Sequence, residues 1–410
     1  MQSSECLFHQ GPKARQSRVH FARGGSHSPL FRVLAGVLLV LLLAFPVVSA
    51  EPFTFVQIAD PQFGLGGYKR DIIRFEETVK QVNKLEPDFV VICGDLVNTS
   101  SIGNTLEHFA KEKSAFAMPC YCVPGNHDVG SGSAELLAQY RRVIGPDYYE
   151  FEHKGHVFLM VNSQLWMEQV PGETEKQEEW FKSSLEKAFA AHKPVFVVAH
   201  HPLYNKSPQE PTDVWSIPIE KRRELLALIE RYGVVAWLAG HVHKNVENEY
   251  KGVQFVSTVN PTFGFFEQAF GFRVWHIGNE RPYRQEFVTL DISGLDPGKE
   301  VTGSVSGLHP GEDCFLVILS GSHKPEHWTV DSVLALEQQS WVREPVKGGK
   351  FAVTGIPAET ITVIAAALTG KPNGLDARFE SVVLTPDEVG LKPLSFVFTD
   401  KSQTSEAGAK

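Results

Sequence analysis

The chain beyond residue 50 alternates short apolar runs with amphipathic stretches. We predict strands over the apolar runs Phe53–Ala59, Asp88–Cys93, Pro119–Val123, Val157–Asn162, Pro194–Ala199 and Val234–Ala239. Several are apolar at nearly every position, which is typical of strands buried on both faces. Between them, apolar residues at helical spacing predict helices over Arg70–Leu85, Thr105–Phe116, Ala134–Val143, Glu173–Ala191 and Lys221–Arg231. Strands that alternate with helices indicate a layered α/β fold.

The pattern changes at about Ile292. Before it, two hairpins complete the first unit: Val246–Tyr250 with Val253–Ser257, and Gly271–Ile277 with Tyr283–Leu290. After it, turn signals separate short strand patterns at Cys314–Leu319, Phe351–Ile356, Ile361–Leu368 and Leu394–Phe398. A helix is expected only over Val330–Gln338. We therefore predict an α/β domain over 51–292, a small all-β sandwich over 293–400 and a frayed polar tail over 401–410.

Residues 1–50 have the pattern of an export signal. A basic stretch precedes the apolar run Val33–Phe45, and the small residues of Val48–Ala50 suit a signal peptidase. The run is too short for a confident membrane span, which needs about 20 residues. We expect residues 1–50 to be removed, giving a secreted or periplasmic protein with no stable membrane span. The alternative is that residues 33–50 remain as a membrane anchor.

Composition and charge exclude several classes of protein. The 410 residues are 42% hydrophobic and 21% charged, which is ordinary for a globular protein and excludes disorder, collagen and coiled coil. The net charge is −9, and the part after the basic leader carries −13. Such an acidic body argues against nucleic acid on a broad basic surface, but it permits a small anionic substrate held by metal ions. The cysteines after residue 50 match neither a zinc site nor a disulfide scaffold, which favours buried apolar thiols.

Polar motifs follow five of the predicted strands directly. They are Asp60-Pro61-Gln62, Gly94-Asp95, Gly125-Asn126-His127-Asp128, His200-His201-Pro202 and Gly240-His241-Val242-His243. The carboxyl ends of neighbouring parallel strands open on one crevice, so these side chains are expected to meet there. Their carboxylate, amide and imidazole donors suit divalent ions such as Mn²⁺, Fe²⁺ or Zn²⁺. Without a cation, burial would disfavour the charged forms, so metal binding is the simplest explanation of the cluster.

In this order, the five motifs resemble those of the calcineurin-like metallophosphoesterases, over roughly residues 53–290. Residues 59–65 and 162–164 resemble most the branch of calcineurin-like phosphoesterase domain-containing proteins, described as serine/threonine phosphatases. The resemblance implies a fold of two mixed β-sheets flanked by helices. It also implies two divalent metal ions, Mn, Fe or Zn, that share Asp95. The remaining implied ligands are Asp60, Gln62 and His243 at the first site, and Asn126, His200 and His241 at the second.

The same resemblance implies the chemistry. Two metals clamp a phosphate and acidify water, and metal-bound hydroxide attacks phosphorus. His127 would serve the leaving oxygen as proton donor or charge stabiliser, with Asp128 orienting its ring. Gln62 stands where most members carry histidine, so the first site should bind metal more weakly. His201 is expected as a wall or substrate contact, and residues 203–218 either as a substrate wall or lid or as a plain crossover.

The sequence thus predicts an exported, metal-dependent phosphoric ester hydrolase. Phosphate monoesters of small molecules or proteins are favoured, with phosphoserine or phosphothreonine implied by the branch. One alternative is a cyclic-nucleotide or other phosphodiesterase. Another is a non-catalytic surface-binding module, which the loss of a ligand or of His127 would have favoured.

Overall fold

The computed structural model describes residues 51–130, 133–263, 269–295, 297–371, 374–399 and 403–408. The predicted signal over residues 1–50 lies outside the described residues. Ala50–Lys410 forms one compact unit. Among the described residues, none of the helices is both long and apolar enough to span a membrane.

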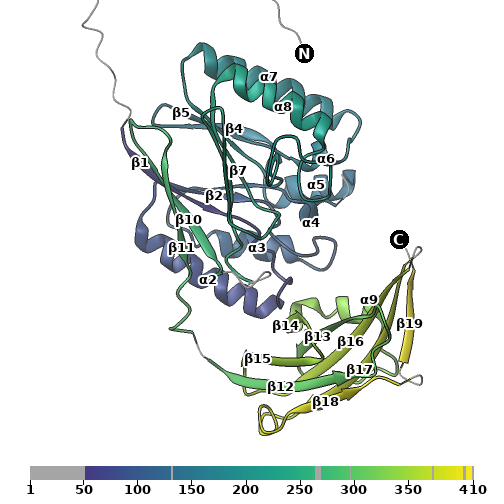
Figure 1. The fold of residues 1–410 in the computed structure, drawn as a ribbon. Coiled ribbons are helices and arrows are strands. Elements are labelled where there is room, and N and C mark those ends of the chain that lie inside the picture. The colour runs from purple at the N-terminus through teal and green to yellow at the C-terminus, as the bar shows by residue number, and fades with distance from the viewer. Residues whose placement is uncertain are drawn as a thin grey trace, which may run out of the picture. The chain divides into compact units, whose positions relative to one another are not determined.

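Two mixed β-sheets form the first lobe (Figure 1). The first has the order β11-β10-β1-β2-β3, with β1 Phe53–Ile58, β2 Phe89–Cys93, β3 Cys120–Val123, β10 Gly271–Ile277 and β11 Arg284–Thr289. The second has the order β4-β5-β6-β7-β9-β8, with β4 Tyr149–His153, β5 His156–Met160, β6 Val195–Val198, β7 Val234–Ala239, β8 Val246–Tyr250 and β9 Val253–Ser257. In the first sheet β1, β2 and β3 run parallel, and β10 and β11 are added by antiparallel pairing on the β1 side. In the second sheet β5, β6, β7 and β9 run parallel, and β4 and β8 pair antiparallel at the two edges.

The core explains why so many strand positions are apolar. Alternate residues such as Phe55 and Phe89 face Phe158 and Phe196 of the other sheet, so the two sheets pack face to face. The opposite faces are covered by helices. The first sheet is covered by α2 Tyr68–Leu85, α3 Thr105–Lys113 and α5 Ala134–Val143, and the second by α7 Glu173–Ala190 and α8 Ile219–Tyr232. Because both faces of these strands are buried, apolar residues do not alternate with polar ones along them.

The second lobe consists of two further sheets, ordered β15-β12-β18 and β14-β13-β16-β17-β19. Their strands are β12 Lys299–Ser306, β13 Asp313–Ser320, β14 Ser340–Pro345, β15 Lys350–Ile356, β16 Ile361–Lys371, β17 Gly374–Leu384, β18 Leu394–Val397 and β19 Gln403–Gly408. One apolar cluster joins the two sheets, with Val301 and Phe396 from one and Ile318 and Val363 from the other. Helix α9 Val330–Leu334 packs on the outer face of the second sheet.

The predicted fold class, an α/β structure of two mixed sheets flanked by helices and followed by an all-β sandwich, is confirmed. Some details differ from expectation. Helix α3 ends at Lys113 because the next amides bond three residues back, as in Ser114 N–H to the Lys111 carbonyl. The helix expected over Val330–Gln338 divides into α9 and the 3-10 turn η1 Glu337–Gln339. Part of the tail expected to fray forms β19, which pairs with β17.

Some short elements were not predicted, because their sequences show no clear apolar run or helical periodicity. Strand β4 lies at a sheet edge and is mostly half-buried, so its sequence alternates polar with aromatic residues. Helices α4 Asn126–Val129 and α6 Gln164–Met167 are too short to show periodicity. The four cysteines after residue 50 are free thiols, and three of them are buried, as expected.

Candidate metal centre

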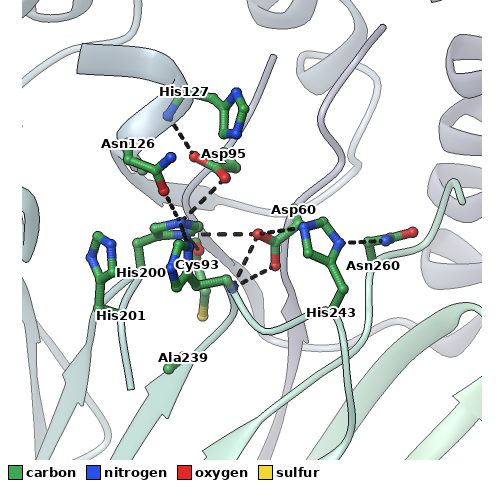
Figure 2. A network of polar contacts seen from close by, with 12 residues as sticks. Asp60, Cys93, Asp95, Asn126, His127, His200, His201, Ala239, His243 and Asn260 are labelled. Carbon is green, nitrogen blue, oxygen red and sulfur yellow. Dashed lines mark hydrogen bonds and ion pairs between the residues drawn. The ribbon is translucent and has the colours of Figure 1, made fainter. Parts of the chain in front are cut away.

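The polar motifs meet where strands of both sheets end. Asp60 follows β1 and Asp95 follows β2 of the first sheet, whereas His200 follows β6 and His241 follows β7 of the second. The crevice therefore lies between the ends of two facing sheets rather than along one. Figure 2 shows Asp60, Asp95 and His200 at the centre of the network.

Backbone conformation at the site is unusual. Predicted ligands adopt positive φ angles: Asp60 51°, Gln62 40°, Asp95 48°, His241 67° and His243 48°. Such angles are uncommon for residues other than glycine and concentrate at functional sites. The loops after β1 and β2 are joined by bonds from Asp60 N–H to the Gly94 carbonyl (3.1 Å) and from Gln62 N–H to the Asp95 carbonyl (2.9 Å). The strained turns are thus held by paired backbone.

Two glycines of the motifs leave room for the carboxylates. A Cβ atom at Gly125 would collide with the carboxylate of Asp95, and one at Gly240 with that of Asp60. Any larger residue at either position would push the carboxylate away. The Gly-Asn-His-Asp and Gly-His-x-His motifs therefore need glycine for close approach.

His200 lies at the centre of the buried cluster. Its Nδ1–H donates to the carbonyl of Cys93 (2.9 Å), and this leaves Nε2 facing the donor groups. Nε2 lies 3.3 Å from Asp95 Oδ2, 3.0 Å from Asn126 Oδ1 and 3.0 Å from His241 Nδ1. The atoms predicted for the second metal site are thereby gathered around one point.

His241 is oriented by its neighbours on both sides. Its backbone N–H donates to both carboxylate oxygens of Asp60, at 3.1 and 3.0 Å. Its Nε2–H donates to the carbonyl of Val214 (2.9 Å), so Nδ1 is the nitrogen available to a metal. Val214 belongs to the 203–218 loop, and the ring of Trp215 lies 5.6 Å from that of His241. This loop is therefore a wall of the centre rather than a plain crossover.

The first predicted site contains a buried ligand atom without a hydrogen-bond partner. Gln62 is 1% exposed, and its Oε1 has no hydrogen-bond partner among the described residues. His243 Nε2 lies 4.0 Å from Asp60 Oδ1, and the amide nitrogen of Asn260 fixes the ring at Nδ1 (2.8 Å). A buried amide oxygen without a partner is costly, and a cation would satisfy it. The residues present therefore fit a metal at this site.

His201 lies closer to the centre than the sequence suggested. A ligand atom of His201 lies within 4.8 Å of those of His200 and His241, a second grouping beside that of Asp60, Asp95 and His200. Its Nδ1 contacts Ser163 Oγ at 2.9 Å, and the side chain is buried. His201 thus joins the side chains that could hold a metal, whereas we had expected a wall or substrate contact.

The ionisable groups of the cluster shift one another's pKa values. Burial and the neighbouring Asp95 raise the pKa of Asp60 well above its usual value. Burial opposes the ionisation of Asp95, but His200 and His127 hold its pKa well below the usual range. Burial also opposes protonation of His200, whereas Asp95 raises the pKa of His200 to about 9. Burial lowers the pKa of His241 to about 4. Without a metal, protonated His200 therefore pairs with ionised Asp95, beside neutral His241 and a protonated Asp60. A divalent cation would bind by displacing the protons of His200 and Asp60.

His127 stands on the Asp95 side of the cluster, away from His243 (Figure 2). Its backbone N–H donates to Asp95 Oδ1 (2.9 Å), and its Nδ1–H donates to the carbonyl of Asn98 (2.7 Å). The ring is thus oriented by a backbone carbonyl.

The predicted role of Asp128 as orienter of that ring is wrong. Its buried carboxylate accepts hydrogen bonds from the N–H groups of Leu96, Val97 and Gly125, at 2.8 to 3.2 Å. Three amide donors already hold the carboxylate, although burial and Asp95 still raise the pKa of Asp128 to about 7. Asp128 therefore shapes the loops that carry Asp95 and His127.

Several supporting groups were missed in the sequence. They are the carbonyls of Asn98 and Val214, Ser163 Oγ, which also accepts from the N–H groups of His200 and His201, and the amide of Asn260. Ser163 and Asn260 come soon after β5 and β9. The predicted ligands were identified as polar residues that follow a predicted strand, and the same criterion would also have identified Ser163 and Asn260. The backbone carbonyl partners could not be predicted, because every residue type carries a backbone carbonyl.

Comparison with known proteins identifies the fold and its chemistry. The sequence profile of the calcineurin-like phosphoesterases matches residues 53–245. The serine/threonine-protein phosphatase CPPED1 of Rattus norvegicus is 32% identical over 281 residues, which cover 60% of this chain and 87% of the relative. The chain belongs to the calcineurin-like phosphoesterase family. Its predicted family and branch are confirmed, as is its assignment to the metal-dependent phosphoesterases.

This calcineurin-like phosphoesterase is also similar to a second curated protein and to a solved structure, which bear other descriptions. The 3',5'-cyclic adenosine monophosphate phosphodiesterase CpdA of Escherichia coli is 28% identical and covers 42% of this chain and 60% of its own. A dimetal phosphatase from Danio rerio, compared by structure, covers 59% of this chain and 100% of its own, with 17% identity and a TM-score of 0.42. Within this phosphoesterase, Asp60, Asp95 and His200 form one group of side chains that could hold a metal ion, and His200, His201 and His241 form another.

Proposed function

We propose that this protein is an exported phosphatase that hydrolyses phosphate monoesters, with phosphoserine or phosphothreonine residues as the favoured substrates. The observation that carries the proposal is the convergence of the buried Asp60, Asp95 and His200 with the half-buried His241, beside the half-buried ring of His127. Two divalent ions bound there would neutralise the phosphate and lower the pKa of water. Gln62, Asn126 and His243 complete the proposed ligand set.

His127 supplies the second half of the chemistry. The Asn98 carbonyl can only accept, so Nδ1 carries a proton and the ring presents Nε2 to the substrate side. Protonated at Nε2, the ring donates a proton to the leaving oxygen as the phosphorus–oxygen bond breaks. The bond from His127 N–H to Asp95 keeps this donor beside the metal ligands.

The substrate class is proposed from the relatives and from the surface beside His241. The relatives described as serine/threonine phosphatases support a phosphomonoester. A cavity of about 680 Å³ is formed largely by the 203–218 loop and offers room for more than a phosphate. Its charged lining residues are Lys206, Glu210, Asp213 and Lys244. A cyclic-nucleotide phosphodiesterase is the second candidate, favoured by the bacterial relative with that description.

A screen on the metal-reconstituted protein tests the activity. Phosphoserine and phosphothreonine peptides, p-nitrophenyl phosphate, bis-p-nitrophenyl phosphate and cyclic AMP are offered with Mn²⁺, Fe²⁺ or Zn²⁺. We expect turnover of the monoesters to exceed that of the diesters. Preferred hydrolysis of cyclic AMP would establish the second candidate, and no hydrolysis with any metal would contradict the proposal.

Export is proposed from residues 1–50 alone. Expression of the full chain, cell fractionation and N-terminal sequencing test it. We expect a product that begins at Glu51 outside the cytoplasm. A full-length product in the membrane fraction would establish the anchor, and a full-length product in the cytoplasm would contradict export.

A further inference from the structure

One side chain of the second lobe reaches the loops that carry the metal centre. Glu337, in η1, is 4% exposed. Its Oε1 accepts hydrogen bonds from Nδ2 of Asn98 (2.9 Å) and from Oγ1 of Thr99 (3.3 Å). Both partners lie in the loop that leaves β2 shortly after Asp95. The sandwich thus contributes a buried carboxylate to a loop of the phosphoesterase lobe.

The same carboxylate lies against the loop that leaves β1. A Cβ atom at Gly64 would lie only 2.7 Å from Glu337 Oε1, so the carboxylate occupies the space that a side chain there would need. Gly64 comes two residues after Gln62. The two loops run side by side, because Asn98 N–H donates to the carbonyl of Phe63 (3.0 Å). Glu337 therefore contacts the loops after β1 and β2, which carry the predicted ligands Asp60, Gln62 and Asp95.

Asn98 connects this carboxylate to the proposed proton donor. Its side-chain amide binds Glu337, and its own carbonyl accepts from Nδ1–H of His127 at 2.7 Å. We propose that Glu337 is a positioning residue, which sets the orientation of the His127 ring through Asn98 and so couples the second lobe to leaving-group protonation. This inference rests on the proposed function, since it assumes that His127 serves the leaving oxygen.

Other contacts hold η1 in place without this carboxylate. Ser340 Oγ accepts from Tyr68 N–H (2.9 Å) and donates to the Glu337 carbonyl (2.6 Å), and Arg343 N–H donates to the Gly66 carbonyl (2.9 Å). Replacing the carboxylate should therefore leave the lobes docked. Its second oxygen, Oε2, has no hydrogen-bond partner among the described residues. Among those residues, Oε1 makes all of its hydrogen bonds to the loop after β2, and Arg343 Nη1 lies 3.9 Å from the same oxygen.

The kinetic test compares substrates by their leaving groups. Glu337→Ala should lower kcat for an alkyl phosphate about tenfold, because a displaced proton donor is costly. It should change kcat for p-nitrophenyl phosphate, whose leaving group needs no proton, by less than about twofold. Glu337→Gln keeps an oxygen acceptor for Asn98 and should restore most of the loss. Gln338→Ala is the matched control, since it removes a neighbouring bond to Asn104 (3.0 Å) and leaves Asn98 untouched.

In a His127→Ala background, Glu337→Ala should have no further effect on alkyl phosphates. An equal loss on both substrates, or an additive loss in that background, would overturn the proposal in favour of a merely structural role. Such a result leaves the proposed phosphatase function standing, because wild-type turnover is measured in the same assay.

A measurement that does not require activity separates the two ideas further. In protein labelled with ¹⁵N-histidine, the Nδ1–H signal of His127 is assigned by its absence from His127→Ala. We expect it to shift or exchange faster in Glu337→Ala but not in Gln338→Ala. An unchanged signal in a folded Glu337→Ala protein would refute the positioning role, whether or not a substrate is known.

Discussion

Asp95 is the residue whose loss should do the most damage, and the prediction can be worked from its contacts. Asp95→Asn keeps the size of the side chain and removes its negative charge. The carboxylate accepts from His127 N–H at 2.9 Å and faces His200 Nε2 at 3.3 Å, and it is 1% exposed. It lies between the proposed proton donor and the proposed second-site ligand. One substitution therefore acts on metal binding and on the placement of His127 together.

The magnitude follows from charge and distance. Opposite unit charges about 4 Å apart attract by about 4 kcal/mol at an effective dielectric constant of about 20. Loss of that attraction for one ion corresponds to roughly a thousandfold weaker binding. A divalent ion next to Asp95 would lose at least as much. We expect Asp95→Asn to retain at most one ion per chain and to lose nearly all turnover.

The assay is metal analysis after desalting, with turnover measured in the same sample. The matched control is Asp88→Asn, at the other end of β2, where the carboxylate accepts from Thr54 N–H (3.0 Å) and His153 (3.0 Å) far from the ligands along the strand. The control should keep its metal and its turnover. Two ions per chain with normal turnover in Asp95→Asn would refute the shared-ligand role.

Three further outcomes are expected. His127→Ala should keep its metal but slow alkyl phosphates by about 10²–10⁴, and aryl phosphates less; equal losses in kcat would argue against a proton donor. Gln62→His replaces a neutral amide oxygen with a nitrogen donor and should tighten zinc retention relative to manganese, as titration of both proteins would show. Burial raises the pKa of Asp71 to about 7. Its folded pKa exceeds its unfolded value, so stability falls as pH rises from about 4 to 7. In Asp71→Asn, up to about 4 kcal/mol of this decrease in the free energy of unfolding should disappear, as measured by urea denaturation at each pH. Identical pH profiles of the free energy of unfolding in the two proteins would contradict the prediction.

The strands and their polar ends could be predicted from the sequence because both depend on local pattern. The apolar run of β2 and the Gly-Asp that follows it placed Asp95 at the crevice. The start of α2 could not be predicted in the same way. This helix begins at Tyr68, whose N–H is bound by Ser340 from nearly the other end of the chain. A cap supplied by another lobe has no local signature.

The partner that orients the His127 ring could not be predicted from the sequence, for a related reason. Asp128 stands beside His127, and adjacency suggested that it would hold the imidazole. Instead, the Asp128 carboxylate accepts hydrogen bonds from three backbone amides, and the His127 ring donates to the backbone carbonyl of Asn98. Every residue carries a backbone carbonyl and every residue except proline an N–H, so residue type cannot indicate which of these groups will face a side chain.

At this centre the motif residues stand in backbone conformations that their residue types rarely adopt. Propensity alone would place glycine at the positive φ angles that Asp60, Asp95 and His243 adopt. Each such position costs on the order of 1–3 kcal/mol and persists only where the surroundings determine it. Here the loops after β1 and β2 are bonded to each other and, through Asn98, to Glu337 of the second lobe. The sandwich therefore belongs to the set of contacts that keep the donors in an unfavourable conformation. That dependence gives a physical reason for the second lobe to be packed against a phosphoesterase that already contains all of the predicted ligands.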